Sequence, residues 1–410
     1  MTEFLHLVSP QTAIENIITQ FPSLSLTEII ATSKAFNRVT AISILAHHSL
    51  PIFQRSAMDG YALCAKDTYG TTDTIPSFFQ VIGEVLMGTE PTFTIEKGQS
   101  AIIHTGGMIP KGADAVVMVE NTQQIRANEI EILRAISVGE NVIQIGEDVT
   151  QGEEIITSGK HLRTGEIGGL MALGITRIQV IRQPKIGIIS TGDEVIPPDQ
   201  LIKIGQVRDV NTYTISTLVM QNGGIPVSYG IIPDQKEVLQ ETATRALEEC
   251  DAVAIIAGSS ASVRDLTADV INNLGQPGVL VHGINIRPGK PTILGICNNK
   301  PVLGLPGNPV SAYVIAELFL TPIMNRLLGV KYFPRPPIRT VLTVNIASQA
   351  GREDWIPARL IATEDGYQTE PIFFKSNLIF TLTKADGLIR IPQSMTGCIA
   401  GKEVEFFLLR

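Results

Sequence analysis

The sequence predicts a multidomain α/β protein in which a partly helical, extended first region carries an inserted β module and is followed by an α/β domain and an all-β tail. Three observations support this prediction. The chain has 410 residues, which is too long for one ordinary domain. Between Pro184 and Gly329, strand-like apolar runs alternate with helical patterns, which is typical of βαβ units and a mostly parallel sheet. Over residues 56–136, and again after residue 337, short β-type runs are separated by Gly, Pro and Asn.

These changes of pattern divide the chain into four domains. They are a first, linker-type and partly helical domain of residues 1–50 and 140–183, an inserted β-rich domain of residues 51–139, an α/β domain of residues 184–330, and a C-terminal β domain of residues 331–410. In the first domain, the spacing of apolar residues predicts a helix over Thr12–Ile18, a second helix starting within Leu26–Ala35, and a third over Thr164–Leu173. The inserted domain is expected to contain strands at Phe78–Val85, Ser100–His104, Ala115–Met118 and Glu129–Leu133.

The α/β domain is expected to alternate strands with helices. The predicted strands are Lys185–Ser190, Pro226–Ile232, Ala252–Ala257 and Val279–His282, and the predicted helices are Tyr213–Gln221, Glu237–Leu247 and Leu266–Leu274. Two further runs, Thr292–Cys297 and Pro301–Leu305, are joined by Asn298-Asn299-Lys300, which suits a hairpin. Ligands of such sheets bind beyond the carboxyl ends of the strands, so Thr191–Glu194, Gly258–Asp265 and Pro306–Asn308 should gather at one edge.

The tail begins with a stiff, proline-rich linker at Tyr332–Pro337. After it, every apolar run is short and of β type. The runs are Thr340–Ile346, Trp355–Leu360, Tyr367–Pro371, Gly387–Ile391 and Glu403–Leu408. They predict an all-β domain.

The composition excludes several classes of protein. A net charge of −8 argues against general nucleic-acid binding, which needs a basic face. The four cysteines are scattered without a CxxC pair, as expected of reduced thiols in a cytoplasmic protein. The N-terminus lacks the apolar stretch of a secretory signal, and no apolar run is long enough to cross a membrane.

The segment Pro306-Gly307-Asn308-Pro309 precedes a helical pattern and is typical of an anion site. Asn308 suits an N-cap, Pro309 suits the first helical turn, and Gly307 lets the backbone approach a ligand. The N–H groups of such a helix start, including that of Ser311, favour an anion.

Two cations reinforce this interpretation. Arg287 and Lys290 flank Pro288-Gly289, which forms a stiff, tight turn. A solvated surface pair is the alternative, and it explains the stiff turn less well. We therefore expect a site for phosphate or another oxyanion beside the helix start.

Acidic and small residues after other strands extend the candidate site. The Asp193-Glu194 pair directly follows a buried-type strand at the expected ligand edge, where acids are more often functional than decorative. Asp234 opens the sequence DQKE, a capping box, so a helix cap is the favoured interpretation. The loop from Gly258 to Asp265, which contains Ser259 and Ser260, could cradle a phosphate or could be a flexible connection with Asp265 capping the next helix.

Three further turns carry polar residues. They contain Asp59 (SAMDGYA), Thr105 (TGGMIP) and Asp148 (GED). Local chemistry favours a simple turn for the first and third, and leaves the second at even odds. An oxyanion near these acids would need a hard divalent cation such as Mg²⁺, which binds carboxylates together with phosphate oxygens. The residues themselves thus indicate a metal-assisted reaction on a phosphorylated or oxyanionic ligand.

The motifs also resemble a known family. In the same order, the molybdopterin molybdenumtransferases, the family of MoeA and the gephyrin E domain, contain SAMDGYA, TGGMIPKGADAVV, GED, STGDE, RPGKP and GLPGNPVSA. The resemblance covers nearly the whole chain. It implies that the α/β domain is a three-layer domain of the molybdopterin-binding type, that the tail is a β-barrel, and that the protein is a homodimer whose cleft combines both subunits.

The resemblance assigns roles by motif position. It implies catalytic roles for Asp59, Thr105, Asp148 and Glu194, and Mg²⁺ handling by Asp234 and Asp265. It implies substrate binding by Ser259, Ser260, Arg287, Lys290, Pro306, Asn308, Ser311 and Ser376.

The activity implied is insertion of molybdate into adenylylated molybdopterin with Mg²⁺ and release of AMP, in contact with other proteins of cofactor biosynthesis. This chain departs from the family pattern at three places. Family members usually have an Arg within the stretch that is Val142–Ile145 here, and a Gly and an acid where Ser262 and Val263 stand. They also often have an Arg at the position of Pro357. Two alternatives therefore stay open: a molybdopterin-binding carrier with weak or no insertion activity, and insertion of tungstate instead of molybdate. A scaffold for other proteins has little support.

Overall fold

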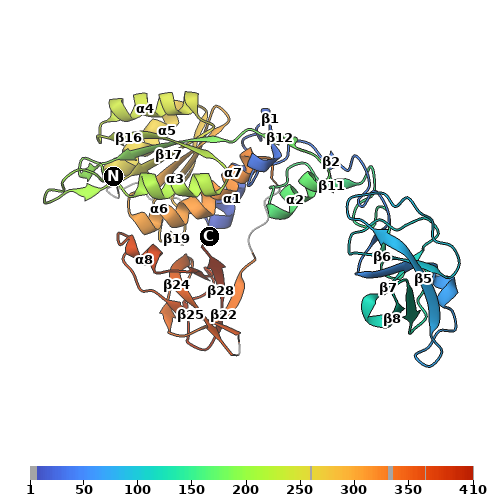
Figure 1. Ribbon diagram of the computed structural model, residues 1–410. Coiled ribbons are helices and arrows are strands. Elements are labelled where there is room, and N and C mark those ends of the chain that lie inside the picture. The colour runs from blue at the N-terminus through green and yellow to red at the C-terminus, as the bar shows by residue number, and fades with distance from the viewer. Residues whose placement is uncertain (1–6, 259–260, 331–335, 365, 410) are drawn as a thin grey trace. The chain divides into compact units, whose positions relative to one another are not determined.

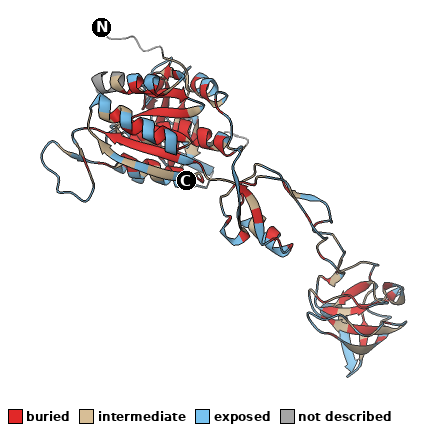
Figure 2. Cartoon of the chain, turned by 90° about the horizontal axis from the view of Figure 1, so that it is seen from above, coloured by how far each residue is buried: buried red, intermediate tan, exposed pale blue. Residues whose placement is uncertain are grey.

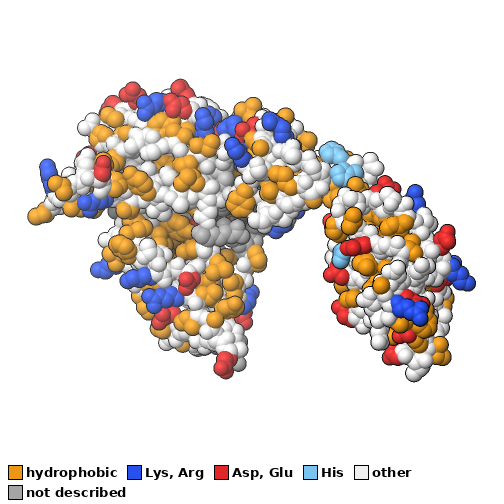
Figure 3. Space-filling model, in the orientation of Figure 1, with side chains coloured by type: hydrophobic (Ala, Val, Ile, Leu, Met, Phe, Trp, Pro, Cys, Tyr) orange, Lys and Arg blue, Asp and Glu red, His pale blue; other side chains and the backbone are white. Residues whose placement is uncertain are grey.

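The computed structural model describes residues 7–258, 261–330, 336–364 and 366–409, with the backbone only over residues 261–265. The chain forms two compact units. The larger unit comprises residues 1–41, 159–163 and 177–410, and the smaller unit comprises residues 42–158 and 164–176. On the face shown in Figure 3, basic side chains are interspersed with acidic ones on each unit. No helix in the described ranges has both the length and the apolar character needed to span a bilayer.

The smaller unit is built on a six-stranded sheet of order β7-β4-β6-β5-β9-β8. The strands are β4 Gly60–Leu63, β5 Ser77–Val85, β6 Gln99–Ile103, β7 Ala115–Met118, β8 Thr122–Arg126 and β9 Glu129–Ile132. All neighbouring pairs are antiparallel except β5 and β6. Apolar side chains on the two faces form two small cores, one around Ile103 and Val116 and the other around Phe79 and Val117. The four strands predicted for this region are confirmed.

Two short strand pairs and a helix complete the smaller unit. β2 Ile44–Leu45 pairs with β11 Glu154–Ile156, and β3 Arg55–Ser56 pairs with β10 Val142–Ile143, both antiparallel. The predicted third helix is α2, Thr164–Ala172. The short 3₁₀ turns η2 Ala65–Thr68 and η3 Val119–Asn121 flank the sheet.

The larger unit begins with α1, Pro10–Ile18, as predicted. Ser9 caps it by accepting a hydrogen bond from the Thr12 N–H at 3.1 Å. The expected second helix within Leu26–Ala35 is wrong. Residues Thr27–Ala31 form strand β1, paired antiparallel with β12 Arg177–Ile181, and only a 3₁₀ turn, η1 Thr32–Lys34, follows. Its β-branched residues suit a strand, and its partner lies so far away in sequence that local periodicity gave no sign of it.

The central sheet of the larger unit has the order β16-β13-β17-β21-β20-β18. Its strands are β13 Lys185–Thr191, β16 Ile225–Ile232, β17 Ala252–Ala257, β18 Pro277–His282, β20 Ile293–Cys297 and β21 Lys300–Pro306. The first four in spatial order run parallel, and β20 and β18 add an antiparallel edge. The short parallel pair β14 Val195–Ile196 and β15 Val207–Arg208 follows β13.

Helices cover both faces of this sheet, so the domain has the expected three layers (Figure 1). The helices are α3 Asn211–Gln221, α4 Lys236–Glu249, α5 Ala261–Leu274, α6 Pro309–Ile315 and α7 Thr321–Leu327, with the π segment η4 Ala316–Leu320 joining the last two. In β17, Ala254 and Ile256 pack against α1, α3 and α6, whereas Val253 and Ile255 pack against α4 and α5. The strand therefore reads as a continuous apolar run, because both of its faces are buried (Figure 2).

The hairpin between β20 and β21 is also confirmed. Asn298 and Asn299 have φ angles of 52° and 64°, the left-handed region that a two-residue hairpin turn requires and that Asn tolerates.

The tail is a closed β-barrel. Its strands are β22 Ile338–Leu342, β24 Glu353–Thr363, β25 Gly366–Pro371, β26 Gly387–Ile391 and β28 Glu403–Leu408, and the β24–β26 pairing closes the ring. The short pair β23 Ile346–Ala347 and β27 Gly397–Cys398 and the helix α8 Phe380–Thr383 lie outside it. One strand of the preceding domain, β19 Ile286–Arg287, joins β24 in parallel and sets Arg287 opposite Asp354.

Candidate functional site

The carboxyl ends of β13, β16 and β21 meet at one edge of the central sheet, as predicted. The Asp234 N–H, after β16, lies 3.4 Å from Asp193 Oδ1, after β13. The amide of Asn211, at the start of α3, donates to the Gly307 carbonyl after β21 at 2.7 Å. A side chain at Gly307 would come within 2.9 Å of the Ala257 carbonyl at the end of β17, so only glycine fits there.

This edge contains several buried polar atoms. Two of them, Asn211 Oδ1 and Thr212 Oγ1, have no partner among the described residues, and Thr191 Oγ1 and Asp234 Oδ1 are buried nearby, where the Thr191 hydroxyl interacts with the Asp234 carboxylate. Most buried polar atoms in proteins have a partner, so two without one at the same sheet edge need a reason. The atoms include acceptors for a cation and hydroxyl groups that can donate to an oxyanion. Their arrangement suits a polar, charged ligand.

Asp234 is not the helix cap that its sequence context predicted. The N-cap of α4 is Gln235, and no side chain caps that helix. Burial raises the pKa of the Asp234 carboxyl, the Thr191 hydroxyl opposes this shift by interacting with the carboxylate, and the neighbouring carboxylates of Asp193 and Glu194 raise the pKa further. The acid thus stands beside two others at the ligand edge, where a bound cation would relieve their mutual repulsion.

The start of α6 is tied to the β-barrel. Asn308 is the N-cap residue and Pro309 occupies the first turn, as predicted. The Asn308 side chain, however, makes no capping hydrogen bond. Its Nδ2 donates to Ser376 Oγ at 3.1 Å, and the Val310 N–H donates to the Ser376 carbonyl at 3.0 Å. Ser311 is buried in the same turn. The structure therefore brings together Asn308, Ser311 and Ser376 from two domains.

The turn with the two cations packs against α6. Gly289 has φ of +108°, and a side chain there would meet Ile315 at 2.4 Å. Ile315 is the last residue of α6, so Gly289 packs against the end of this helix.

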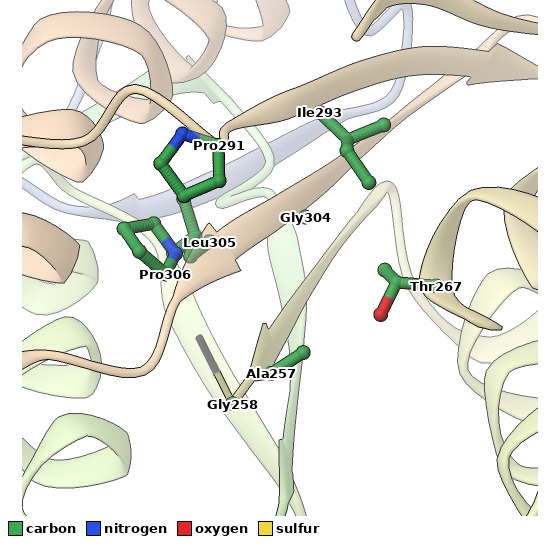
Figure 4. A pocket seen from close by; sticks show the side chains of 8 residues that line it. All are labelled: Ala257, Gly258, Thr267, Pro291, Ile293, Gly304, Leu305 and Pro306. Carbon is green, nitrogen blue, oxygen red and sulfur yellow. The ribbon is translucent and has the colours of Figure 1, made fainter. Parts of the chain in front are cut away.

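The cations themselves are exposed. Lys290 has no ion-pair partner within the described ranges, and Arg287 lies 3.9 Å from the buried Asp354, which Arg352 also binds at 2.7 and 3.1 Å. Pro291, next to Lys290, lines a small cavity together with Gly258 and Pro306 (Figure 4). That cavity, about 10 Å³, has room for one water molecule at most. It nonetheless shows that the turn borders the ends of β17 and β21.

In the smaller unit, Asp59 and Thr105 lie together. The Thr105 N–H and hydroxyl donate to Asp59 Oδ1 at 2.7 and 3.1 Å. The Thr105 N–H is the main cause that lowers the pKa of Asp59, and the hydroxyl adds to it. Gly60 is required next to Asp59, because a side chain there would meet the Val117 carbonyl at 1.9 Å. The carboxylate is therefore held ionised at the end of β6.

Asp148 lies apart from that pair in the contacts of the described residues. Its N–H donates to the Leu50 carbonyl at 3.0 Å, and its carboxylate is exposed in the turn after Gly146.

Three family models match successive parts of the chain: the MoeA N-terminal region (domain I and II) over residues 8–174, a probable molybdopterin binding domain over residues 187–326, and the MoeA C-terminal region (domain IV) over residues 339–409. A putative molybdopterin biosynthesis protein of Methanocaldococcus jannaschii is 36% identical over 386 residues, which are 92% of this chain and 91% of the relative.

The chain belongs to the MoeA family. A second relative, a protein of Nostoc named molybdopterin molybdenumtransferase, is 30% identical and covers 95% of this chain and 91% of its own. Two crystal structures of molybdopterin biosynthesis MoeA protein from Pyrococcus horikoshii are 34% and 30% identical, with TM-scores of 0.78 and 0.85. Each match extends over 98% of this chain, and over 99% and 100% of the two Pyrococcus chains. The predicted family and fold class are confirmed.

In this MoeA-family chain, the acids at the sheet edge have the oxygen atoms that a magnesium ion prefers. Within the described ranges, no group of three or more His, Cys, Asp or Glu side chains forms a metal cage. Mg²⁺ commonly binds through one or two carboxylates, with waters and phosphate oxygens completing its shell. The carboxylates of Asp234 and Glu194, which lie close enough to influence each other, offer such a partial site.

Some predicted residues lie outside the described part of the structure. They are Ser259, Ser260 and the side chain of Asp265, whose backbone belongs to α5. The structure also adds residues that the sequence reasoning missed. Asn211 and Thr212 could have been found as polar residues at a helix start near the ligand edge. Glu84 and His104 gave no sign in sequence, because they come together only through the pairing of β5 and β6.

Proposed function

We propose that this chain transfers molybdenum from molybdate to adenylylated molybdopterin in a Mg²⁺-dependent reaction that releases AMP. That the protein is a MoeA-type transferase of molybdenum cofactor biosynthesis follows from family membership. The proposed substrate, the Mg²⁺ dependence and the release of AMP are supported above all by the edge of the central sheet. There, the buried atoms Asn211 Oδ1 and Thr212 Oγ1 have no partner among the described residues, and the pKa of the Asp234 carboxyl is raised by burial and by two further acids.

The larger unit supplies groups for both charge signs of this substrate. Lys290 and Arg287 are exposed cations on a turn fixed by Gly289, and they suit the phosphates of the adenylate. Asp234 and Glu194 would hold Mg²⁺, which, when bound, neutralises charge on the phosphoanhydride as that bond breaks. The Thr212 hydroxyl, which has no partner among the described residues, can donate to phosphate or molybdate oxygens.

The smaller unit supplies a carboxylate suited to proton transfer. In the transfer reaction, MoO₄²⁻ and a dithiol give a trioxomolybdenum dithiolene and water, so both thiol protons leave with the released oxygen. Asp59 is kept ionised by Thr105, so it can take a thiol proton as the thiolate attacks molybdenum and then pass this proton to the departing oxygen, which leaves as water with the second thiol proton. Because Thr105 donates to Oδ1 of Asp59, the other carboxylate oxygen is the one that can take the proton.

We further propose that the protein acts in the cytoplasm as a homodimer and meets other proteins of cofactor biosynthesis there. The scattered cysteines support a reducing compartment. Light scattering of the purified chain measures the oligomeric state, and a mass of one chain would contradict the dimer.

The test uses the purified full chain with adenylylated molybdopterin, Mg²⁺ and molybdate. AMP release and cofactor formation are followed for the wild type, Asp59→Asn and Lys290→Ala, with Glu90→Gln as a control because Glu90 is exposed and makes no ion pair among the described residues. We expect both products from the wild type and the control, and loss of both in the two variants. Binding of the substrate without AMP would indicate a carrier instead, and products with tungstate alone would change the metal but not the reaction.

A further inference from the structure

A histidine stands between two carboxylates in the smaller unit. His104 Nε2 lies 2.9 Å from Glu84 Oε1, and its Nδ1 lies 3.9 Å from Asp59 Oδ1. Each ring nitrogen therefore faces a carboxylate oxygen.

The sheet dictates this arrangement. β5 and β6 are parallel neighbours, and Glu84 stands opposite Ile102. His104 follows Ile102 by two residues, so it points to the same side of the sheet as Glu84. Gly60, directly after Asp59, stands opposite Ile103 on the other side of β6. The three side chains thus come from three adjacent elements and converge at the end of β6.

Asp59 depends on such contacts for its orientation. Its side chain is 66% exposed, so packing does not fix the carboxylate. Its partners within the described ranges are Thr105, through the N–H and hydroxyl, and the His104 ring. An isolated pair of His104 with Glu84 would contribute little, because exposed ion pairs contribute about 0–1 kcal/mol. The His104–Glu84 pair matters here because it places the His104 ring against Asp59.

We propose that His104 is a positioning residue for Asp59 in molybdenum transfer, and that Glu84 orients the His104 ring for this role. The inference rests on the proposed function and adds two residues to it. Glu84 holds Nε2, which turns Nδ1 toward Asp59, and the ring then limits the carboxylate to the orientation that Thr105 also selects. The role of Glu84 is transmitted through His104.

The experiment compares His104→Gln, Glu84→Gln and the double variant with two controls, His47→Gln and Glu90→Gln. His47 and Glu90 are exposed residues of the same unit without hydrogen bonds among the described residues. For His104→Gln we expect kcat of AMP release to fall about tenfold, as for other residues that orient a reacting group, with KM unchanged. For Glu84→Gln we expect a smaller fall in kcat. The kcat of the double variant should equal that of His104→Gln, because Glu84 acts through His104 and the two effects are therefore not additive.

Two further readouts separate positioning from a merely structural role. Added imidazole should restore part of the activity of His104→Ala, since the site is exposed and can admit the free base. The melting temperature of all variants should stay at the wild-type value, because surface substitutions seldom change stability. A wild-type kcat in His104→Gln, or additive losses in the double variant, would overturn the proposal.

A separate measurement tests whether the His104 ring contacts Glu84 and Asp59, and it applies even if the wild type releases no AMP and the proposed function fails. The His104 Cε1–H resonance, assigned by its absence in His104→Gln, is recorded at pH 7 in the full chain. We expect it to move in both Glu84→Gln and Asp59→Asn and to stay in place in Glu90→Gln. An unchanged resonance in Asp59→Asn would show that the ring does not contact Asp59, and the inference would be wrong.

Discussion

Asn308 Nδ2 donates a hydrogen bond to Ser376 Oγ at 3.1 Å, which joins the first turn of α6 to the β-barrel. The backbone of Ser376 adds a second link, through its carbonyl and the Val310 N–H. The helix start at the candidate site is thus shaped by a residue of the β-barrel that comes 68 positions later in the chain. Without the barrel, the Asn308 amide would lose this hydrogen-bond partner, and the first turn of α6 would no longer be held in place.

Replacing Ser376 by alanine tests this link. The backbone bond remains, so only the hydroxyl contact is lost, and we expect the free energy of unfolding to fall by about 1 kcal/mol. KM for the adenylylated substrate should rise, because Asn308 is no longer held. Urea unfolding and steady-state kinetics measure the two effects, with Ser394→Ala as the matched control, an exposed serine without a hydrogen bond among the described residues. Equal behaviour of the two variants would contradict the link.

Asp234→Asn should stabilise the protein while abolishing its Mg²⁺ response. The pKa of Asp234 is raised in the folded state, so folding holds its proton more tightly than the unfolded chain does. The wild type therefore loses stability as pH rises from the unfolded pKa through the raised folded pKa. The variant has no such loss, so its urea midpoint should exceed that of the wild type at pH 7 and converge with it at pH values below the unfolded pKa.

Magnesium gives the same prediction a second readout. Added Mg²⁺ should raise the melting temperature of the wild type, since it binds the folded state, but not that of Asp234→Asn. If both proteins gain equally from Mg²⁺, Asp234 is not a ligand.

Thr105→Val should impair turnover with little effect on folding. The variant keeps the N–H bond to Asp59, which is the main cause of the lowered pKa of that carboxyl, and loses the hydroxyl bond. Asp59 should stay ionised at neutral pH, so the decline in kcat, about tenfold for a lost bond to a charged group, reflects orientation alone. Thr105→Ser should recover most of the rate. Failure of serine to do so would show that the hydroxyl is not the important group.

Gly289→Ala should disturb the turn that carries Lys290. The new methyl group would meet Ile315 at 2.4 Å, and the φ of +108° disfavours any side chain. We expect a loss of about 1–3 kcal/mol in unfolding free energy. Gly351→Ala is the control, because its φ is +85° but no atom lies within 4 Å of the added carbon. The difference between the two variants isolates the contact with α6, and equal losses would argue against close packing there.

Sequence reasoning succeeded where short-range chemistry decides the structure. The Asn298-Asn299 turn, the apolar run of β17 and the Pro309 helix start each depend on neighbouring residues, and each is confirmed. It failed at Thr27–Ala31, where pairing with β12, far away in sequence, overrides a local helical pattern. It also misjudged Asp234, because the like charges that turn this residue into a ligand candidate come from another strand end.

The candidate site shows the same division. Motif position assigned Asp59 and Thr105 to one role and Asn308 and Ser376 to another, and the structure brings each of these pairs into contact. No local signal could pair Glu84 with His104, since parallel strand register is what brings them together. The position of the two cations relative to α6 was likewise set by the packing of Gly289 on Ile315, which a sequence does not display.

The central claim is that breakage of the adenylate and transfer of molybdenum are one coupled reaction on this chain. A single-turnover experiment tests it directly, with enzyme in excess over adenylylated molybdopterin, Mg²⁺ present, and molybdate either added or omitted. AMP and molybdenum bound to the dithiolene are measured in the same samples over time. The account predicts equal amounts of the two products with molybdate and much slower AMP release without it. AMP release at the same rate without molybdate, or without transfer of molybdenum, would contradict the account.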